Sequence, residues 1–248
     1  GNTKDALKWY ERGRELLDDV DVQQSIAIAR LMGGELEAMY EFECKYHQPR
    51  RKPIAEAGIP RWAGEDLTGK TVIVAHEQGF GDTIQFARFI SRIKAERVIW
   101  SGPVALEILM QDNFKFDTIM DEDGPFVADY YCSPISACGA LKAEYASVDG
   151  KPYMTAKPIK LPDRGKLKIG LAWAGNVDYA HDADRTIALE ELMPLLEVQG
   201  TAFYSLQVGR GEDEISKLGL DGMIANLGGT FKDWRDTARA IAALDLVI

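Results

Sequence analysis

Short runs of β-branched and aromatic residues alternate with stretches of helical periodicity from about residue 71 onward. The runs are TVIVA, RVIW, FDTIM and DYYC, followed by KIGLAWAG, AFYSLQVG, MIANL and DLVI. Apolar positions at helical spacing separate them, at 82–95 and 103–111 in the first set and at 188–198 and 233–243 in the second. Strands that alternate with helices are typical of a parallel sheet built from βα units. The pattern predicts an α/β protein with two Rossmann-like lobes.

The N-terminal region follows a different pattern. Residues 3–47 contain no proline and repeat apolar positions at helical spacing, which predicts two or three amphipathic helices. Turns are expected at 18–21 and at Gly33-Gly34. At this spacing, large side chains are typical of core positions. We expect the following residues of this arm to be buried: Trp9, Tyr10, Met39, Tyr40, Phe42 and Tyr46.

Two proline-rich stretches divide the chain. The segments 48–70 and 151–166 each hold three prolines, and prolines of this density favour extended connectors. A further proline, Pro194, falls inside the helix expected at 188–198, so this helix is expected to kink or to begin later. The predicted organisation is a helical arm (1–47), a connector (48–70), a first lobe (71–150), a linker (151–166) and a second lobe (167–248).

Composition narrows the classes of function. The net charge of -10 and the pI near 4.9 argue against binding to nucleic acid or to anionic lipid, because both need clustered positive charge. The three cysteines, Cys44, Cys132 and Cys138, have neither disulfide-framework nor zinc-site spacing. No apolar run approaches the roughly 18 residues of a membrane span, and the N-terminal sequence does not resemble a secretory signal. We expect a cytoplasmic protein without a bound metal, a cofactor or a membrane span.

The stretch HEQGFGDTIQF joins a predicted strand to a predicted helix. Gly79 and Gly81 permit a tight turn, and Asp82 then falls at or beside the N-cap of the helix. One interpretation is that Asp82 only caps the helix, which stabilises it by about 1 kcal/mol. The other is that Asp82 is a general base at the rim of a cleft, where it takes a proton from an attacking hydroxyl. Spacing alone does not separate the two.

A second polar turn lies in GLAWAGNVDYAHDADRTIALEEL. A strand is expected to end at Trp173, Gly175-Asn176 then form the turn, and Arg185-Thr186 precede a helix. A helix N-terminus beside an arginine suits a diphosphate. The alternative is that Arg185 is a surface charge paired with Asp182 or Asp184. His181, in the same loop, is expected to be solvated rather than catalytic.

These motifs resemble a known family. The segments GFGDTIQFAR and LAWAGN carry the most specific likeness, and RLMGGELEAMYEFECKYH is similar to the last helical hairpin of a repeat array. The chain resembles tetratricopeptide-repeat proteins that carry a heptosyltransferase-like glycosyltransferase region, from about residue 5 onward. A repeat of this kind cannot bury its apolar face alone. The arm is therefore expected to pack against the first lobe or against further repeats.

The resemblance implies a metal-independent GT-B glycosyltransferase, in which Asp82 is the catalytic base. It also implies a nucleotide-sugar donor, an acceptor that is a glycan or a protein, and a protein partner for the arm. The family continues beyond a segment matching DLVI, so the second lobe is expected to be incomplete, as an inactive fragment or a natural remnant. The donor-binding residues that it implies are Gly81, Thr83, Gly175, Asn176, Arg185, Thr186 and Gln207.

Two other functions are compatible with parts of the sequence. A non-catalytic scaffold of the tetratricopeptide-repeat type would bind a partner through the aromatic side chains of the arm. An NAD-dependent oxidoreductase would suit Rossmann-like lobes, but the third glycine of a GxGxxG fingerprint and the acidic ribose ligand are both missing from the sequence. The scaffold therefore stands as the alternative.

Overall fold

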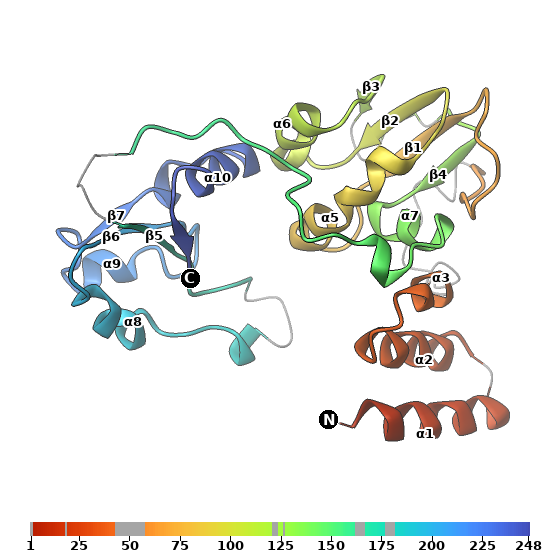
Figure 1. Ribbon diagram of the computed structural model, residues 1–248, viewed down its shortest axis with the longest axis horizontal. Helices are drawn as coiled ribbons and strands as arrows, with labels where there is room; N and C mark the ends of the chain where they lie inside the picture. The colour runs from red at the N-terminus through yellow and green to blue at the C-terminus, as the bar shows by residue number, and fades with distance from the viewer. Residues whose placement is uncertain are drawn as a thin grey trace. The chain divides into compact units, whose positions relative to one another are not determined.

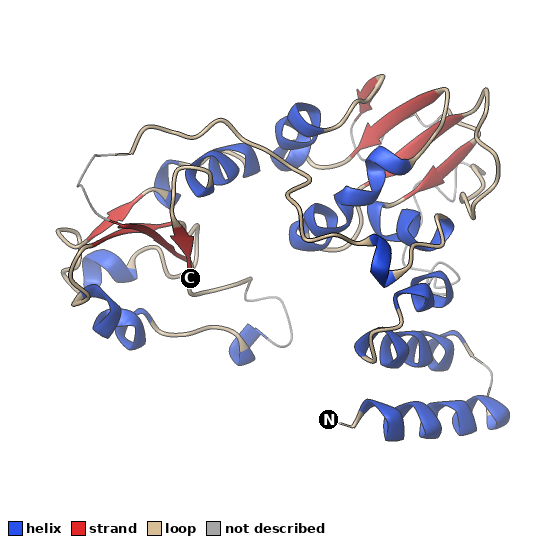
Figure 2. Ribbon diagram, viewed as in Figure 1, coloured by secondary structure: helices blue, strands red, loops and turns tan. Residues whose placement is uncertain are grey.

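The computed structural model describes residues 2–17, 19–42, 58–120, 124–125, 127–161, 167–176 and 182–248. Figure 1 shows the elements along the chain, and Figure 2 colours them by type. The chain splits into two compact units, one of residues 1–107 and 113–154 and the other of residues 108–112 and 155–248. The first unit holds the helical arm and the first lobe, and the second unit holds the second lobe.

The arm is a short stack of helices, as the sequence predicts (Figure 1). Its elements are α1 (Thr3–Leu16), α2 (Val20–Met32), a 3-10 turn over Leu36–Ala38 and α3 (Met39–Phe42). Asp19 begins α2, where its side chain accepts a 2.9 Å hydrogen bond from the Val22 amide. Gly33 follows the last turn of α2. The turn expected at Gly33-Gly34 is confirmed, whereas of the turn expected at 18–21 the first residue lies outside the described part of the chain and the last two belong to α2.

Burial within the arm departs from the prediction. Met39 is buried, but Trp9 is 67% exposed and Tyr10 is 42% exposed. The core assignment is therefore wrong for Trp9 and Tyr10, because α1 packs against α2 without burying any of its own residues. The structure does not describe the burial of Tyr40. Tyr46 and Cys44 lie outside the described residues.

Helix α3 contacts α7 of the first lobe. The arm thus packs against the first lobe, which is one of the two arrangements that the sequence suggested. The stack is anchored at its α3 end and extends away from the lobe toward α1 (Figure 1).

The first lobe is built on a four-stranded parallel sheet with the order β3-β2-β1-β4. Its strands are β1 (Thr71–Ala75), β2 (Arg97–Ser101), β3 (Thr118–Met120) and β4 (Tyr130–Cys132). Its helices are α5 (Phe80–Phe86) with a 3-10 continuation over Ala87–Arg92, α6 (Val104–Asn113) and α7 (Pro134–Ala140). All four strands fall within segments that the sequence predicted.

The centre of this sheet is dry. Val72, Ile73 and Val74 of β1 are 0% exposed, and complete burial of an aliphatic side chain stabilises a fold by about 1.5–3 kcal/mol. Ile73 packs on one face against Ile99 and Ile59. Because successive strand residues alternate between faces, the two valines point to the opposite side.

Part of the expected connector belongs to the first lobe. The Trp62 amide donates to the Tyr131 carbonyl at 2.8 Å, and the Tyr131 amide donates to the Pro60 carbonyl at 3.0 Å. Residues 60–62 therefore extend the sheet beyond β4 with parallel pairing at Arg61. The buried side chains of Ile59 and Trp62 explain this, because an extended segment with large apolar residues gains more from packing than from solvation.

Helix α7 was not predicted. Its sequence, PISACGA, shows no amphipathic period because all seven residues are buried. Ser133 starts the helix by accepting from the Ser136 amide at 3.0 Å, while Ser136 Oγ accepts from the Ser133 amide at 2.7 Å. Small residues let α7 pack closely against α3, α5 and β4.

The second lobe repeats the same topology. Its parallel sheet has the order β7-β6-β5-β8, so the first-to-fourth strand order matches that of the first lobe. The strands are β5 (Leu167–Leu171), β6 (Thr201–Ser205), β7 (Ile224–Asn226) and β8 (Leu246–Val247). The helices are α8 (Leu189–Leu196), α9 (Glu214–Lys217) and α10 (Trp234–Ile241). Helix α9 was not predicted.

Helices cover both faces of this second sheet, with α8 and α9 on one side and α10 on the other (Figure 1). Phe203 packs with Leu189 and Ile215 on the first side. Tyr204, its neighbour in β6, packs on the other side with residues that follow α10. Both lobes therefore have the layered α/β architecture that the sequence predicts.

The predicted linker is attached at both ends. The Tyr153 hydroxyl donates to the Ile84 carbonyl in the first lobe at 2.8 Å. In the second lobe the Ile159 amide donates to the Arg239 carbonyl at 3.1 Å, and Leu161 is buried. Helix α8 begins at Leu189 and contains Pro194. Strand β5 ends at Leu171, two residues before the predicted end, because the Trp173 amide donates its hydrogen bond to the Gln207 side chain and not to a neighbouring strand.

Candidate functional site

Polar loops follow the carboxyl ends of the strands in each lobe, where open α/β sheets bind ligands. In the first lobe the loop after β1 starts with His76, whose amide donates to the Ser101 carbonyl at 2.7 Å. Gln78 has a φ of 63°, an unusual left-handed conformation for a residue with a side chain. Gly79 then begins α5 as its N-cap. The turn is therefore tight, and its tip is exposed from Gln78 to Gly81.

Asp82 lies one turn inside α5 rather than at the N-cap. Its Oδ2 accepts a hydrogen bond of 3.1 Å from the amide of Gly79, so it returns to the helix start from the third helical position. The side chain is partly exposed. The capping interpretation is thus confirmed for one oxygen, and the carboxylate still reaches the surface.

The two neighbours of Asp82 have different environments. Gly81 is exposed, and a methyl group there would meet no atom within 4 Å. Thr83 is buried; its hydroxyl donates to the Glu77 carbonyl at 3.2 Å and lies 2.8 Å from His76 Nδ1. Gly81 therefore has open space around it, and its role in donor binding stays a prediction. The Thr83 hydroxyl instead secures the loop between β1 and α5.

In the second lobe the loops after β5 and β6 are held together by Gln207. Its Oε1 accepts from the amides of Trp173 and Ala174, both at 3.0 Å. Its Nε2 donates to the carbonyls of Ala174 at 3.0 Å and Arg210 at 2.6 Å. Gln207 is 4% exposed. These bonds use the polar atoms of its side chain, so none is left for the donor contact that the sequence suggested.

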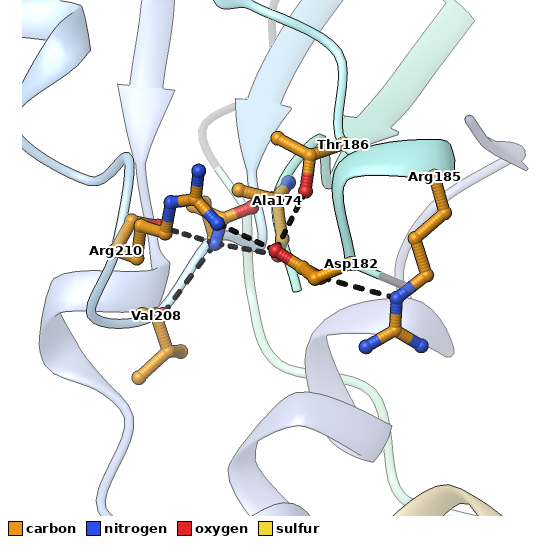
Figure 3. Close-up of polar contacts among 7 residues, drawn as sticks. Ala174, Asp182, Arg185, Thr186, Val208 and Arg210 are labelled. Atoms are coloured by element: carbon orange, nitrogen blue, oxygen red, sulfur yellow. Dashed lines mark hydrogen bonds and ion pairs between the residues drawn. The ribbon is translucent and has the colours of Figure 1, made fainter. Parts of the chain in front are cut away.

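Asp182 is the centre of a charged cluster beside this clamp (Figure 3). It accepts from Arg185 Nε at 3.1 Å, from the Thr186 hydroxyl at 3.0 Å, and from Arg210 Nη1. Its side chain is 5% exposed, whereas those of Arg185 and Arg210 are 54% and 48% exposed. A buried carboxylate therefore holds two guanidinium groups at the surface.

The cluster fixes the charge state of Asp182. Burial raises the pKa of its carboxyl group. The hydrogen bonds from Thr186 and Arg185, together with the charges of Arg185 and Arg210, lower this pKa by more than burial raises it. The net result is a pKa below the ordinary value for aspartate. Asp182 is thus ionised at neutral pH and is available as a counter-ion rather than as a proton donor.

The alternative predicted for Arg185, an ion pair with Asp182 or Asp184, is confirmed for Asp182, although the acid is buried. Gly175 lies against this pair, and a methyl group there would overlap the Asp182 carboxylate and the Arg185 guanidinium. Asn176 is exposed at the end of the described part of the loop. A side chain at 175 would thus make the Asp182–Arg185 pair shift, whether or not a phosphate binds.

The N-terminus of α8 already has an acidic partner. The amide of Leu189, its first residue, donates to Glu214 Oε2 at 3.1 Å. A carboxylate at this position satisfies the positive end of the helix dipole. The expectation that this helix start meets the diphosphate therefore loses support, and the arginines remain as the cationic groups.

Arg210 and Asp182 were not among the residues predicted for the site. The sequence signal for Arg210 is its place between Gly209 and Gly211, whose φ angles are 72° and 83°. Glycines in this conformation mark a tight, fixed turn. Asp182 carried no signal beyond its proximity to Arg185.

The predicted role of His181 falls outside the described residues. Among the residues with described positions, no group of three His, Cys, Asp or Glu side chains is placed to hold a metal ion. Cys132 and Cys138 are both buried, and neither is in a disulfide with a described residue. None of the helices that the structure describes is long and apolar enough to cross a bilayer.

Comparison with known proteins gives one distant relative. The chain is 23% identical over 223 residues to protein FlbA of Caulobacter vibrioides (strain ATCC 19089 / CIP 103742 / CB 15). The alignment covers 76% of this chain and 37% of FlbA, so the chain spans little more than a third of that protein's length. No protein-family model matches the sequence. No solved structure matches it.

Proposed function

We propose that this chain is part of a GT-B-type glycosyltransferase that moves a sugar from a nucleotide-diphosphate donor to an acceptor hydroxyl. The observation that carries the proposal is the position of Asp82, a partly exposed carboxylate beyond the carboxyl end of β1 in a Rossmann-like sheet. Ligands of such sheets bind at this edge. The likeness of GFGDTIQFAR to heptosyltransferase-like enzymes supports the same residue.

In the proposed reaction Asp82 takes the proton of the acceptor hydroxyl. The acceptor oxygen then bonds to the anomeric carbon of the donor, and the bond from that carbon to the diphosphate oxygen breaks. The diphosphate leaves with the electron pair, and Arg185 stabilises the added negative charge. The roles of Asp82 and Arg185 require nothing beyond a carboxylate and a cation at the surface of their respective lobes.

The test is Asp82→Asn, which keeps an oxygen that can accept from the Gly79 amide but removes the base. General-base catalysis contributes about 10²–10⁴ in rate, so transfer should fall by that factor while the melting temperature stays unchanged. The readout is release of nucleoside diphosphate from UDP-, GDP- and ADP-sugars with peptide and glycan acceptors.

A matched control is Asp236→Asn, since Asp236 also occupies the third position of a helix and accepts from the Lys232 amide, at 3.1 Å. The control should retain full turnover. Equal turnover in parent and Asp82→Asn would remove Asp82 from the mechanism.

A second candidate is a protein-binding scaffold, and the exposed arm favours it. Leu16, Leu17 and Trp9 of the arm are 85%, 61% and 67% exposed, and contiguous exposed apolar side chains mark interaction surfaces. A Trp9→Ser, Leu16→Ser double variant should lose a captured protein that the parent retains. The scaffold is favoured if that loss occurs in a chain whose melting temperature no nucleotide sugar raises.

A further inference from the structure

The loop that carries Arg210 is fixed by contacts on both sides of that residue. Gln207 Nε2 holds the Arg210 carbonyl at 2.6 Å, and Gly209 and Gly211 both adopt positive φ. A methyl group on Gly211 would lie 2.9 Å from Trp173 Nε1, so the turn is packed directly on a buried indole. The direction in which Arg210 leaves the backbone is therefore set by the fold.

Asp182 sets the other end of the Arg210 side chain. Its Oδ2 accepts from Arg210 Nη1, while its Oδ1 accepts from Arg185 Nε. The two guanidinium groups consequently lie on either side of one carboxylate (Figure 3). Within this trio, two guanidinium groups share a single carboxylate.

The Arg210 guanidinium has donors to spare. An arginine has five N–H donors. Among the described residues, the Arg210 side chain donates one hydrogen bond, to Asp182. Its side chain is 48% exposed. An arginine that is held by one nitrogen while the others face solvent is preorganised to bind a phosphate.

We infer that Arg210 is a second phosphate-contacting residue of the second lobe, and that Asp182 positions Arg210 and Arg185 so that the lobe prefers a diphosphate to a monophosphate. The inference rests on the proposed function insofar as the diphosphate belongs to a sugar nucleotide. Two guanidinium groups fixed on opposite oxygens of one carboxylate offer a separate cation to each phosphoryl group. A monophosphate cannot use both to the same extent.

The direct test measures binding of inorganic pyrophosphate and inorganic phosphate to this chain by calorimetry. Pyrophosphate should bind more tightly than phosphate, and Arg210→Ala should weaken pyrophosphate binding about tenfold to a hundredfold, the range for a hydrogen bond to a charged group. Lys217→Ala is the charge-matched control in the same lobe, because Lys217 is 68% exposed and pairs only with Asp213 among the described residues. It should change binding by less than about twofold.

Two further variants separate positioning from net charge. Arg210→Lys keeps the charge but loses the planar fork, so binding should remain weak. Asp182→Asn removes a negative charge beside the site, so simple electrostatics predicts tighter binding. Positioning by Asp182 predicts weaker binding, because the guanidinium groups lose their shared ionic partner. Tighter binding in Asp182→Asn, or parent-like binding in Arg210→Ala, would overturn the inference.

The melting temperature of each variant without ligand shows whether it is folded. If Asp182→Asn does not fold, the pyrophosphate affinity of Arg210→Lys tests the inference instead. Arg210-dependent pyrophosphate binding in a chain that transfers no sugar would uphold this site and reject glycosyl transfer. Sugar transfer at the parent rate by Arg210→Ala would uphold glycosyl transfer and reject this site. A chain that does not bind pyrophosphate at all also rejects it.

Discussion

The loop after β1 and the loop after β5 occupy equivalent places in two sheets of the same strand order. The aspartate near each loop nevertheless has a different environment. Asp82 is partly exposed and accepts from a backbone amide of its own helix. Asp182 is 5% exposed and accepts from two arginines. The topology thus decides where a polar loop lies, and burial decides which charge reaches solvent. The first lobe presents an acid, and the second presents cations.

The same contrast extends to what holds each loop. The first loop depends on the hydroxyl of Thr83, with its two contacts, whereas the second depends on the Gln207 amide and on close glycine contacts between neighbouring loops. The Gln207 amide makes more hydrogen bonds than the Thr83 hydroxyl does. Substitutions in the second lobe should therefore cost more than equivalent ones in the first.

The largest effect is expected from Gly228→Ala, in the loop after β7. A methyl group there would overlap the carbonyl of Gln207, which is backbone and cannot rotate away. Overpacking of this kind costs about 3 kcal/mol or more. Urea unfolding followed by tryptophan fluorescence measures it. Gly222→Ala, where a methyl group would meet no atom within 4 Å, should leave the unfolding midpoint nearly unchanged; a similar loss in both would refute the packing argument.

Gln207→Ala should follow in magnitude. It leaves the amides of Trp173 and Ala174 without their acceptor in a largely buried loop. Each unsatisfied buried group costs about 1–3 kcal/mol, so the free energy of unfolding should fall by about 2–4 kcal/mol. The same variant should lose pyrophosphate affinity, because the Arg210 turn is released. Retained stability would show that the clamp is dispensable.

Thr83→Val tests the first lobe at matched volume. The valine fills the same space but removes the hydroxyl between His76 and Glu77. A net loss of about 1–2 kcal/mol is expected from these bonds. The measurement is the same urea series. A loss larger than that of Gln207→Ala would reverse the proposed ranking of the two loops.

The smallest effect is expected at Asp182, and it depends on pH. Asp182 has a depressed pKa in the folded chain, whereas an unfolded aspartate titrates near about 3.9. The contribution of Asp182 to the free energy of unfolding is therefore fully present above about pH 4, and it is lost as pH falls through the pKa of the folded chain. Asp182→Asn should be less stable than the parent at pH 7 and should depend less on pH below about 4. Asp5→Asn, at an exposed site on α1, should keep the parent slope.

Local sequence patterns predicted the helices and strands that have a regular spacing of apolar residues or a capping residue at the helix start. The β strands were found from β-branched runs, and α2 and α10 from helical spacing with an aspartate at each N-cap. They were insufficient for α7, which is buried on every side and so has no polar face to reveal it. They also misplaced Trp9 and Tyr10, because amphipathic spacing shows that a helix has an apolar face without showing what covers it.

For the candidate site, the sequence by its own pattern pointed to Asp82, Gly81 and Arg185, since each stands beside a glycine turn or before a predicted helix. The partnership of Asp182 with Arg210 joins residues 28 positions apart, and it exists because β5 and β6 pair in parallel and bring their following loops together. Gln207 changed from an expected ligand contact to an internal clamp for the same reason. Spacing along a chain specifies which side chains can act, but the pairing of strands specifies which of them meet and which are already engaged.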